Sequence, residues 1–244
     1  MVAMRAVLGL PVVLGAMLVA AGADAALLPR HLTGVAGTTN AYYDTAINIT
    51  WLRDANYAQT SGFAAGGLMT FATAQSWAAA LTLGGVSGWS LADVAQPDAA
   101  CASQDVTYGS TGAGCTGGQL GHMFYTLLGG TAGTNITTSH GANFALFDNV
   151  SDGSYWSMTS LPLSADPRDL GYFLTFGNAP DTTPAGWVSL NFKTVPMPGC
   201  LVHAGDVGEA LDIPEPTSLL VLALGGVALG LARRPRSRVS TPAG

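Results

Sequence analysis

Long apolar runs lie near both ends of this 244-residue chain, whereas shorter apolar and polar stretches alternate in its middle. The first run, Val7–Ala21, follows Arg5 and is itself followed by small residues at Ala23 and Ala25. A basic start, an apolar stretch and a small-residue cleavage site are the three parts of a secretory signal peptide. We therefore predict that residues 1–25 are a signal peptide cleaved after Ala25; a retained membrane helix is the alternative.

The second apolar run, Thr217–Ala232, carries no charged residue. As a helix its 16 residues would be about 24 Å long, slightly short of the roughly 30 Å hydrocarbon core of a bilayer. Arg233 and Arg234 follow directly, and basic residues mark the cytoplasmic flank of a membrane helix. The run predicts a C-terminal transmembrane helix with the main body outside the cell; a buried core helix is the alternative.

Two segments of the middle region have helical spacing. The first begins after Thr70, a favourable N-cap, and ends before Gly84-Gly85. Its apolar residues recur at intervals of three and four: Phe71, Ala74, Trp77, Ala78 and Leu81. The second covers Leu120–Leu128 and is stopped by Gly129-Gly130. We predict one amphipathic helix in each.

Other segments alternate with a period of two, which is typical of β-strands. Ala41–Asp54, rich in aromatic and β-branched residues, predicts one or two strands, and Val188–Lys193 alternates most clearly. Further strands are expected at 155–159, 170–176 and 200–204. This order predicts an α+β fold with two helices on one side of a twisted antiparallel sheet. Residues 85–118 show little pattern.

The region between the two apolar ends is acidic. Residues 26–213 hold four basic residues against 13 acidic ones, so their formal net charge is −9. Nucleic acids and anionic membrane surfaces bind clustered Lys and Arg, so we exclude both as partners of this region. Its 188 residues are enough for one domain with its own core.

Three cysteines in an exported chain allow one disulfide and one free thiol. Cys101 and Cys115 enclose a short Gly- and Ser-rich loop, and we predict that they pair. Cys200 lies beside Leu201 and Val202, so its free thiol is expected to be buried. The two other pairings remain open alternatives.

Pro214-Glu215-Pro216 precedes the C-terminal apolar run, and Arg233 and Arg234 follow it. This order, over residues 214–238, resembles the PEP-CTERM sorting signal of exopolysaccharide-producing Gram-negative bacteria. The resemblance implies that exosortase, a membrane-embedded transpeptidase, reads Pro214, Glu215 and Pro216 and cuts near them. The expected route is export, an inner-membrane intermediate held by the C-terminal helix, and then the outer surface or the extracellular matrix.

The middle region resembles the Lcl C-terminal domain family. The matching segments are 48–56, 69–71 with Trp77, 85–91, 121–125, 155–157 and 205–207. Two positions differ, because Ser90-Leu91-Ala92 replaces an Arg-Leu-Pro of the family and His203 replaces an arginine. The resemblance implies a C-type lectin-like domain at residues 26–207, followed by a linker at 208–213, with adhesion or glycan binding and no established enzymatic activity.

Gln96-Pro97-Asp98 reproduces a tripeptide with which galactose-binding C-type lectins coordinate Ca²⁺. Those lectins add a Trp-Asn-Asp cluster, where this chain has Tyr155-Trp156-Ser157 and no carboxylate. A turn is the other interpretation of Gln96 and Asp98. The His and Cys residues show no metal-binding spacing, so we expect no other metal site.

No nucleophile motif accompanies the histidines, so we expect no catalytic residues. Aromatic rings that stack on sugars are the remaining binding candidates. The candidates are Trp187, Trp156 and Trp89, together with Tyr108 and Tyr172. The sequence predicts an exported, non-enzymatic surface or biofilm-matrix protein that binds exopolysaccharide or another matrix component. A self-associating structural protein and an extracellular polysaccharide hydrolase are the alternatives.

Overall fold

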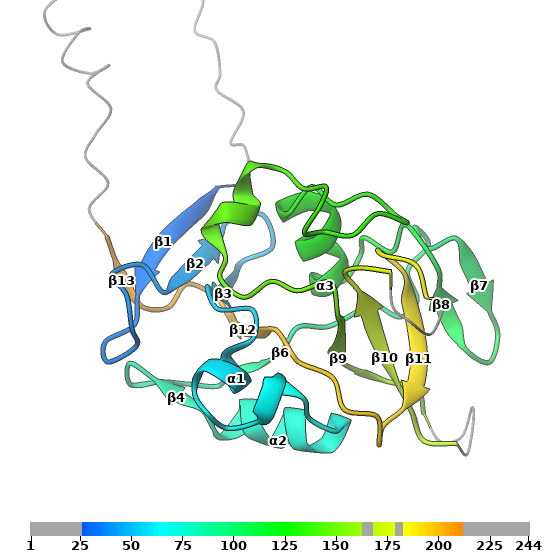
Figure 1. Cartoon of the computed structure of the whole chain (residues 1–244), viewed down its shortest axis with the longest axis horizontal. Helices are drawn as coiled ribbons and strands as arrows, with labels where there is room; N and C mark the ends of the chain where they lie inside the picture. Colours follow the sequence, from blue (N-terminus) through cyan, green and yellow to red (C-terminus); the bar gives the residue numbers. More distant parts are fainter. Residues whose placement is uncertain (1–25, 163–167, 179–182, 212–244) are drawn as a thin grey trace, which may run out of the picture.

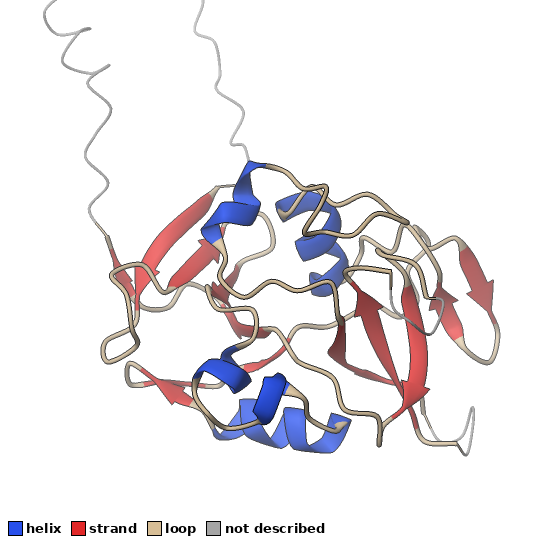
Figure 2. Ribbon diagram, in the orientation of Figure 1, coloured by secondary structure: helices blue, strands red, loops and turns tan. Residues whose placement is uncertain are grey.

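Antiparallel strands dominate the computed structural model, which describes residues 26–162, 168–178 and 183–211 (Figures 1 and 2). The signal peptide with Ala23 and Ala25 lies outside these residues, as does the segment 214–238 with Pro214 and Arg233. Within the described residues, no helix has both the length and the apolar composition to cross a bilayer.

The larger sheet has six antiparallel strands in the order β13-β1-β2-β3-β12-β6. They are β1 Leu27–His31, β2 Ala41–Asp44, β3 Ile49–Leu52, β6 Ser90–Leu91, β12 Leu201–Ala204 and β13 Glu209–Ala210. β2 and β3 are a hairpin, which confirms the strands predicted within 41–54, and β12 confirms the strand predicted at 200–204.

The smaller sheet has three strands in the order β11-β10-β9. They are β9 Ser154–Ser160, β10 Leu170–Thr175 and β11 Val188–Phe192, so all three strands predicted there are confirmed. Every residue of the central strand β10 is buried, whereas β11 lies at the edge and becomes more exposed towards Phe192. The expectation of a single sheet is wrong, because the strands divide between two sheets.

Both predicted helices are present. α2, Phe71–Ala80, is capped by Thr70, whose Oγ1 accepts a hydrogen bond from the Thr73 amide. α3, Gln119–Gly121, continues directly into the π-helical turn η2, His122–Leu127. The short helices α1 Tyr57–Thr60, η1 Ala65–Gly67 and η3 Ala142–Leu146 were not predicted. A sheet-rich fold with few helices is compatible with the α+β class.

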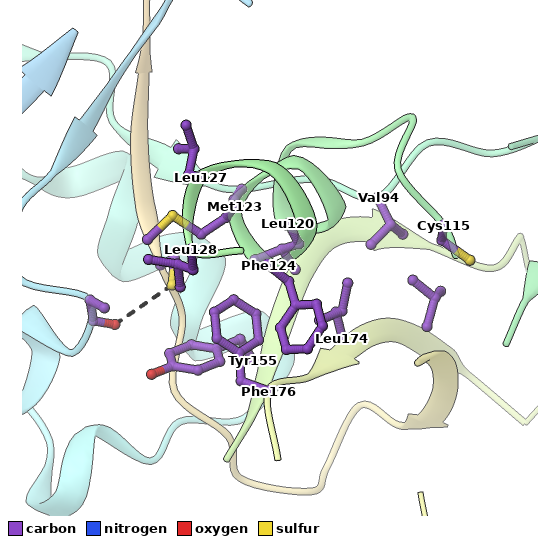
Figure 3. Packing of buried hydrophobic residues seen from close by; sticks show 14 of the residues in the cluster. Val94, Cys115, Leu120, Met123, Phe124, Leu127, Leu128, Tyr155, Leu174 and Phe176 are labelled. Atoms are coloured by element: carbon purple, nitrogen blue, oxygen red, sulfur yellow. Dashed lines mark hydrogen bonds between the residues drawn. The ribbon is translucent and has the colours of Figure 1, made fainter. Parts of the chain in front are cut away.

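Two hydrophobic clusters fill the interior. The first packs α3 and η2 against β9 and β10, and Figure 3 shows Leu120 and Phe124 of this helix facing Tyr155 and Leu174 of the sheet. The second lies under α2, where Phe71 packs edge-on against Trp156, with ring centres 5.3 Å apart. Buried aromatic pairs of this kind add about 0.5–1.5 kcal/mol beyond their burial. Neighbouring residues of β9 and β10 face opposite sides, so α3 and η2 cover one face of these strands and α2 covers the other. The expectation that both helices lie on one side of a sheet is therefore wrong.

Short hairpins occupy the region that lacked a sequence pattern. β4 Thr82–Leu83 pairs with β5 Val86–Ser87, and β7 Ser103–Asp105 pairs with β8 Gly109–Thr111. Figure 1 shows the β7–β8 hairpin at one end of the molecule, beside β11. Gly112, directly after β8, forms an isolated β-bridge with Val188 of β11.

The segment predicted as a linker, 208–213, is a strand in part. Glu209 and Ala210 pair with His31 and Arg30 of β1. Gly208, at φ 90°, turns the chain onto the edge of β1, so that β13 covers this edge at Arg30 and His31. The first strand and the last described strand are therefore neighbours.

Candidate ligand-binding site

An aromatic pocket lies where the β7–β8 hairpin meets the end of β11. Its volume is about 260 Å³, and it is lined by Tyr108, Arg168, Leu170, Leu190, Asn191 and Phe192. The side chains of Tyr108 and Phe192 are 37% and 50% exposed, which is unusual for large rings in this chain. We call this site the aromatic pocket.

Arg168 and Tyr108 form one wall of the aromatic pocket. The guanidinium of Arg168 lies 5.5 Å from the centre of the Tyr108 ring, and its Nη2 donates a hydrogen bond to the Tyr108 hydroxyl at 2.9 Å. A guanidinium above a ring is attracted by the electron-rich face. The pair joins a flat apolar surface to charged hydrogen-bond donors, the combination that binds a ring bearing hydroxyl groups.

The backbone around Tyr108 is held by the turn that connects β7 to β8. One carboxylate oxygen of Asp105 accepts hydrogen bonds from the amides of Tyr108 and Thr107, and these bonds lower the pKa of Asp105. The Tyr172 hydroxyl donates to the Tyr108 carbonyl at 2.9 Å. Tyr108 is therefore presented by a fixed turn although its ring faces solvent.

Gln96 secures the next residues of the hairpin. Its side-chain amide bonds both backbone groups of Ser110, accepting from the amide and donating to the carbonyl. Gly109 lies between Tyr108 and Ser110 and has a φ of 69°. A Cβ at this position would be 2.4 Å from the Gln96 side-chain oxygen and 2.7 Å from the Tyr172 hydroxyl. A glycine is required at this position both for its backbone conformation and for space.

The oxygens of Gln96 and Asp98 accept hydrogen bonds within the hairpin, and calcium binding by these two residues stays a prediction. The Asp98 carboxylate accepts hydrogen bonds from the amides of Ala100 and Gly117, and Gln96 Oε1 accepts from Ser110. Backbone N–H groups thus stabilise the ionised carboxylate of Asp98 and fix the Gln96 side chain. Both residues organise the turn.

The predicted disulfide between Cys101 and Cys115 is confirmed, and Cys200 is the buried free thiol. Asp98 lies beside the disulfide within metal-binding distance, but disulfide sulfurs are not thiolates and do not coordinate metal ions. Cys101 and Asp98 also share a backbone hydrogen bond. The disulfide and Asp98 thus fasten the base of the same hairpin that carries Tyr108.

Of the three predicted tryptophan contacts, two are wrong. Trp89 and Trp156 are buried, and their indole N–H groups donate to the carbonyls of Val86 and Met69. Both rings belong to the hydrophobic cluster under α2, so neither can stack on a ligand. Tyr172 is also buried. Trp187 is 38% exposed just before β11, and its role in binding stays a prediction.

The C-terminal residues 212–237 match the family model of the PEP-CTERM protein-sorting motif. The chain carries an exosortase sorting signal. No curated protein matches the chain, and neither does any solved structure. The sorting signal indicates export in Gram-negative bacteria through a membrane-anchored intermediate that exosortase processes.

The sorting signal begins close behind the folded body. Asp206 accepts two hydrogen bonds from Arg30, at 2.6 and 2.7 Å, and β13 then pairs with β1 up to Ala210. Pro214 is four residues further along. Fully extended, those residues span at most about 14 Å. The exosortase signal therefore follows the sheet with almost no spacer.

Ser90 and His203, the two residues predicted from the sequence to replace arginines, lie on neighbouring strands. Ser90 on β6 pairs with Val202 on β12, and His203 follows. His203 Nε2 lies 3.0 Å from the Ser87 carbonyl, and its ring packs edge-on against Trp89. The His203 imidazole therefore contacts the Ser87 carbonyl of β5 and the buried Trp89 ring, so it contributes to packing between the strands.

A buried polar cluster near η2 was not predicted from the sequence. Asp44 Oδ2 lies 2.8 Å from His122 Nε2 and 3.4 Å from the indole nitrogen of Trp51. Burial raises the pKa of Asp44, but the hydrogen bonds from His122, the Ala46 amide and Trp51 outweigh it, so the pKa lies below its usual value. Asp44 and His122 are 78 residues apart in the sequence, so no local sequence pattern predicts that they meet.

Proposed function

We propose that this chain is a non-enzymatic surface or matrix protein that binds exopolysaccharide through the aromatic pocket. Export and processing follow from the sorting motif. The observation that carries the binding proposal is the pairing of two exposed rings, Tyr108 and Phe192, with the donors of Arg168 and Asn191 in one hollow. Aromatic faces with a few convergent polar groups are what a carbohydrate site requires.

The form of the aromatic pocket suits a polymer. Small-molecule sites usually enclose about 300–1,000 Å³, and this pocket is slightly smaller and open to solvent. Trp187 precedes β11 and Phe192 ends it, so about 16 Å of edge strand separates their backbones. Several weak contacts along such an edge favour a long chain over a free monosaccharide.

The resemblance to Lcl C-terminal domains supports the same proposal, because adhesion and glycan binding are the roles implied by that family. The alternative of a self-associating protein linked through Cys200 receives no support from the fold. That thiol is buried, and it donates a hydrogen bond to the Ala55 carbonyl at 3.7 Å. A covalent dimer through Cys200 would require partial unfolding.

The test is affinity electrophoresis of the mature exported protein in gels that contain exopolysaccharide from its own host. Tyr108→Ala and Phe192→Ala should each weaken binding about 30-fold, because removal of an anchoring ring costs about 2 kcal/mol. Val106→Ala is the matched control, since Val106 is fully exposed on the same turn and does not line the pocket. Equal affinity of all three variants would exclude the aromatic pocket.

Processing has its own test. Mass spectrometry of the mature C-terminus should find a chain that ends near Pro214, and deletion of exosortase should leave the segment up to Arg234 attached. A tail that is intact in both strains would contradict processing.

A further inference from the structure

A second cavity, larger than the aromatic pocket, lies on another part of the molecule. Its volume is about 490 Å³, and we call it the α1 cleft. It opens where the loop after β1, the first turn of α1 and the segment after η3 meet. Its lining includes Leu52 and Phe147 as an apolar floor, with Tyr57, Asp54 and Asn149 around it. This volume is within the range of small-ligand sites.

The basic side chain that lines the α1 cleft, Arg53, is already neutralised. Its Nε lies 2.9 Å from Asp148 Oδ2, and Nη2 donates to Asp148 Oδ1 at 3.1 Å. Its Nη1 donates to the Thr39 carbonyl. Arg53 and Asp148 therefore contribute no net charge to a ligand.

Asp54 leaves the α1 cleft with one uncompensated negative charge. It is paired with Asp148 in a parallel β-bridge, which brings the two residues to adjacent positions at the cleft. One Asp54 oxygen accepts a hydrogen bond from the Asn56 amide at 2.9 Å. Among the described residues, nothing donates to the other oxygen.

The remaining basic side chains of the described chain are engaged elsewhere. Arg30 pairs with Asp206, Lys193 pairs with Asp169, and Arg168 contacts Tyr108 in the aromatic pocket. Within the described ranges, a cationic ligand would therefore meet no competing side-chain ammonium or guanidinium in the α1 cleft beyond the paired Arg53.

We propose that the α1 cleft binds a sugar that carries a protonated amino group. The ammonium would pair with Asp54, the sugar ring would lie against Tyr57 and the apolar floor, and Thr60 and Asn149 would meet its hydroxyl groups. Those two side chains are joined by a hydrogen bond of 3.2 Å at the exposed rim. The choice of a sugar as the carrier of the amine rests on the proposed function. The choice of a cation rests on the charges of the α1 cleft.

The test is isothermal titration of the purified mature protein with a tetramer of glucosamine and with the same tetramer fully N-acetylated. Acetylation removes the positive charge, so the amine form should bind at least about tenfold tighter. Asp54→Asn should lose that preference, and its amide oxygen can still accept from the Asn56 amide. Glu209→Gln is the charge-matched control, because Glu209 is exposed on β13, away from the lining.

Ala36→Lys provides a second variant for the case that Asp54→Asn fails to fold. Ala36 is an exposed lining residue, so a lysine there places an ammonium at the cleft without disturbing the core. It should abolish binding of the glucosamine tetramer. Equal binding of the amine and acetyl tetramers, or of the wild type and both variants, would overturn the proposal.

Two further arms test the chemistry of the ligand and the position of its site. A lysine-containing tetrapeptide offers the same ammonium without a sugar, and binding as tight as that of the glucosamine tetramer would overturn the assignment to an amino sugar. In Tyr108→Ala the preference for the amine tetramer over the acetylated tetramer should persist, whatever happens to total sugar binding. Loss of that preference in Tyr108→Ala would place the amine at the aromatic pocket and refute the α1 cleft.

Discussion

The guanidinium of Arg168 lies over the ring of Tyr108 and donates a hydrogen bond to its hydroxyl, so the two side chains form a single wall. Neither residue is near the other in sequence, and 60 positions separate them. The wall depends on two sheets meeting, because the β7–β8 hairpin carries Tyr108 and Arg168 lies two residues before β10 begins at Leu170.

Arg168→Gln tests this wall. The variant should weaken exopolysaccharide binding about two- to fivefold, since an exposed cation–π contact is worth about 0.5–1 kcal/mol. The free energy of unfolding should fall by no more than about 1 kcal/mol, because Arg168 is exposed and its cation–π contact with Tyr108 is worth about that much. Affinity electrophoresis with the unfolding curve beside it measures both. Unchanged affinity would show that Arg168 takes no part in binding.

Removal of the disulfide should affect both stability and binding. A loop of about 15 residues is worth about 3 kcal/mol in the unfolded chain, so Cys101→Ser with Cys115→Ser should lower the free energy of unfolding by about that amount. Because the disulfide lies at the base of the hairpin, affinity for exopolysaccharide should fall as well. A fully folded double variant with wild-type affinity would show that the aromatic pocket does not depend on the disulfide.

Asp44 should make stability depend on pH. Its pKa in the folded protein is lowered, so its stabilising effect is complete above the usual aspartate pKa of about 3.9 and is lost as the pH falls through the lower folded value. Asp44→Asn should cost about 1–3 kcal/mol at neutral pH. Urea unfolding from neutral to acid pH should show this difference shrinking below about pH 4. A constant difference would contradict the lowered pKa.

The Cys200 thiol should not react in the folded protein. Burial raises its pKa above the usual range, and the charge of Asp54 adds to this effect, so little thiolate forms. Iodoacetamide at mildly alkaline pH should label no cysteine until denaturant is added, and then one. Rapid labelling of the native protein, or a dimer on non-reducing gels that is lost in Cys200→Ser, would contradict the buried position.

Sequence patterns located elements whose signals are local. Thr70 as N-cap and the alternation at Val188–Phe192 depend on neighbours a few positions away, and both were predicted. The β7–β8 hairpin was not, because its strands are three residues long and Ser103–Asp105 is fully polar and exposed. Trp156 could be recognised as aromatic, but its burial depends on α2 and β10 packing over it.

The candidate sites were less predictable than the elements. Tyr108 was noted among other aromatic residues, but its partner Arg168 comes from a segment that follows β9. At the α1 cleft, Arg53 donates a hydrogen bond to Asp148, which lies 95 residues away in the sequence. Such pairs arise from the tertiary fold, in which strands far apart in sequence become neighbours, and one sequence holds no local signal for them.

Glycan binding at the aromatic pocket is tested most directly by the affinity of the mature exported protein for exopolysaccharide from its own host, compared with that of Tyr108→Ala. We expect saturable binding by the wild type, about 30-fold weaker binding by Tyr108→Ala and unchanged binding by Val106→Ala. Absence of binding by the folded wild type, or equal affinity of wild type and Tyr108→Ala, would contradict the proposed function.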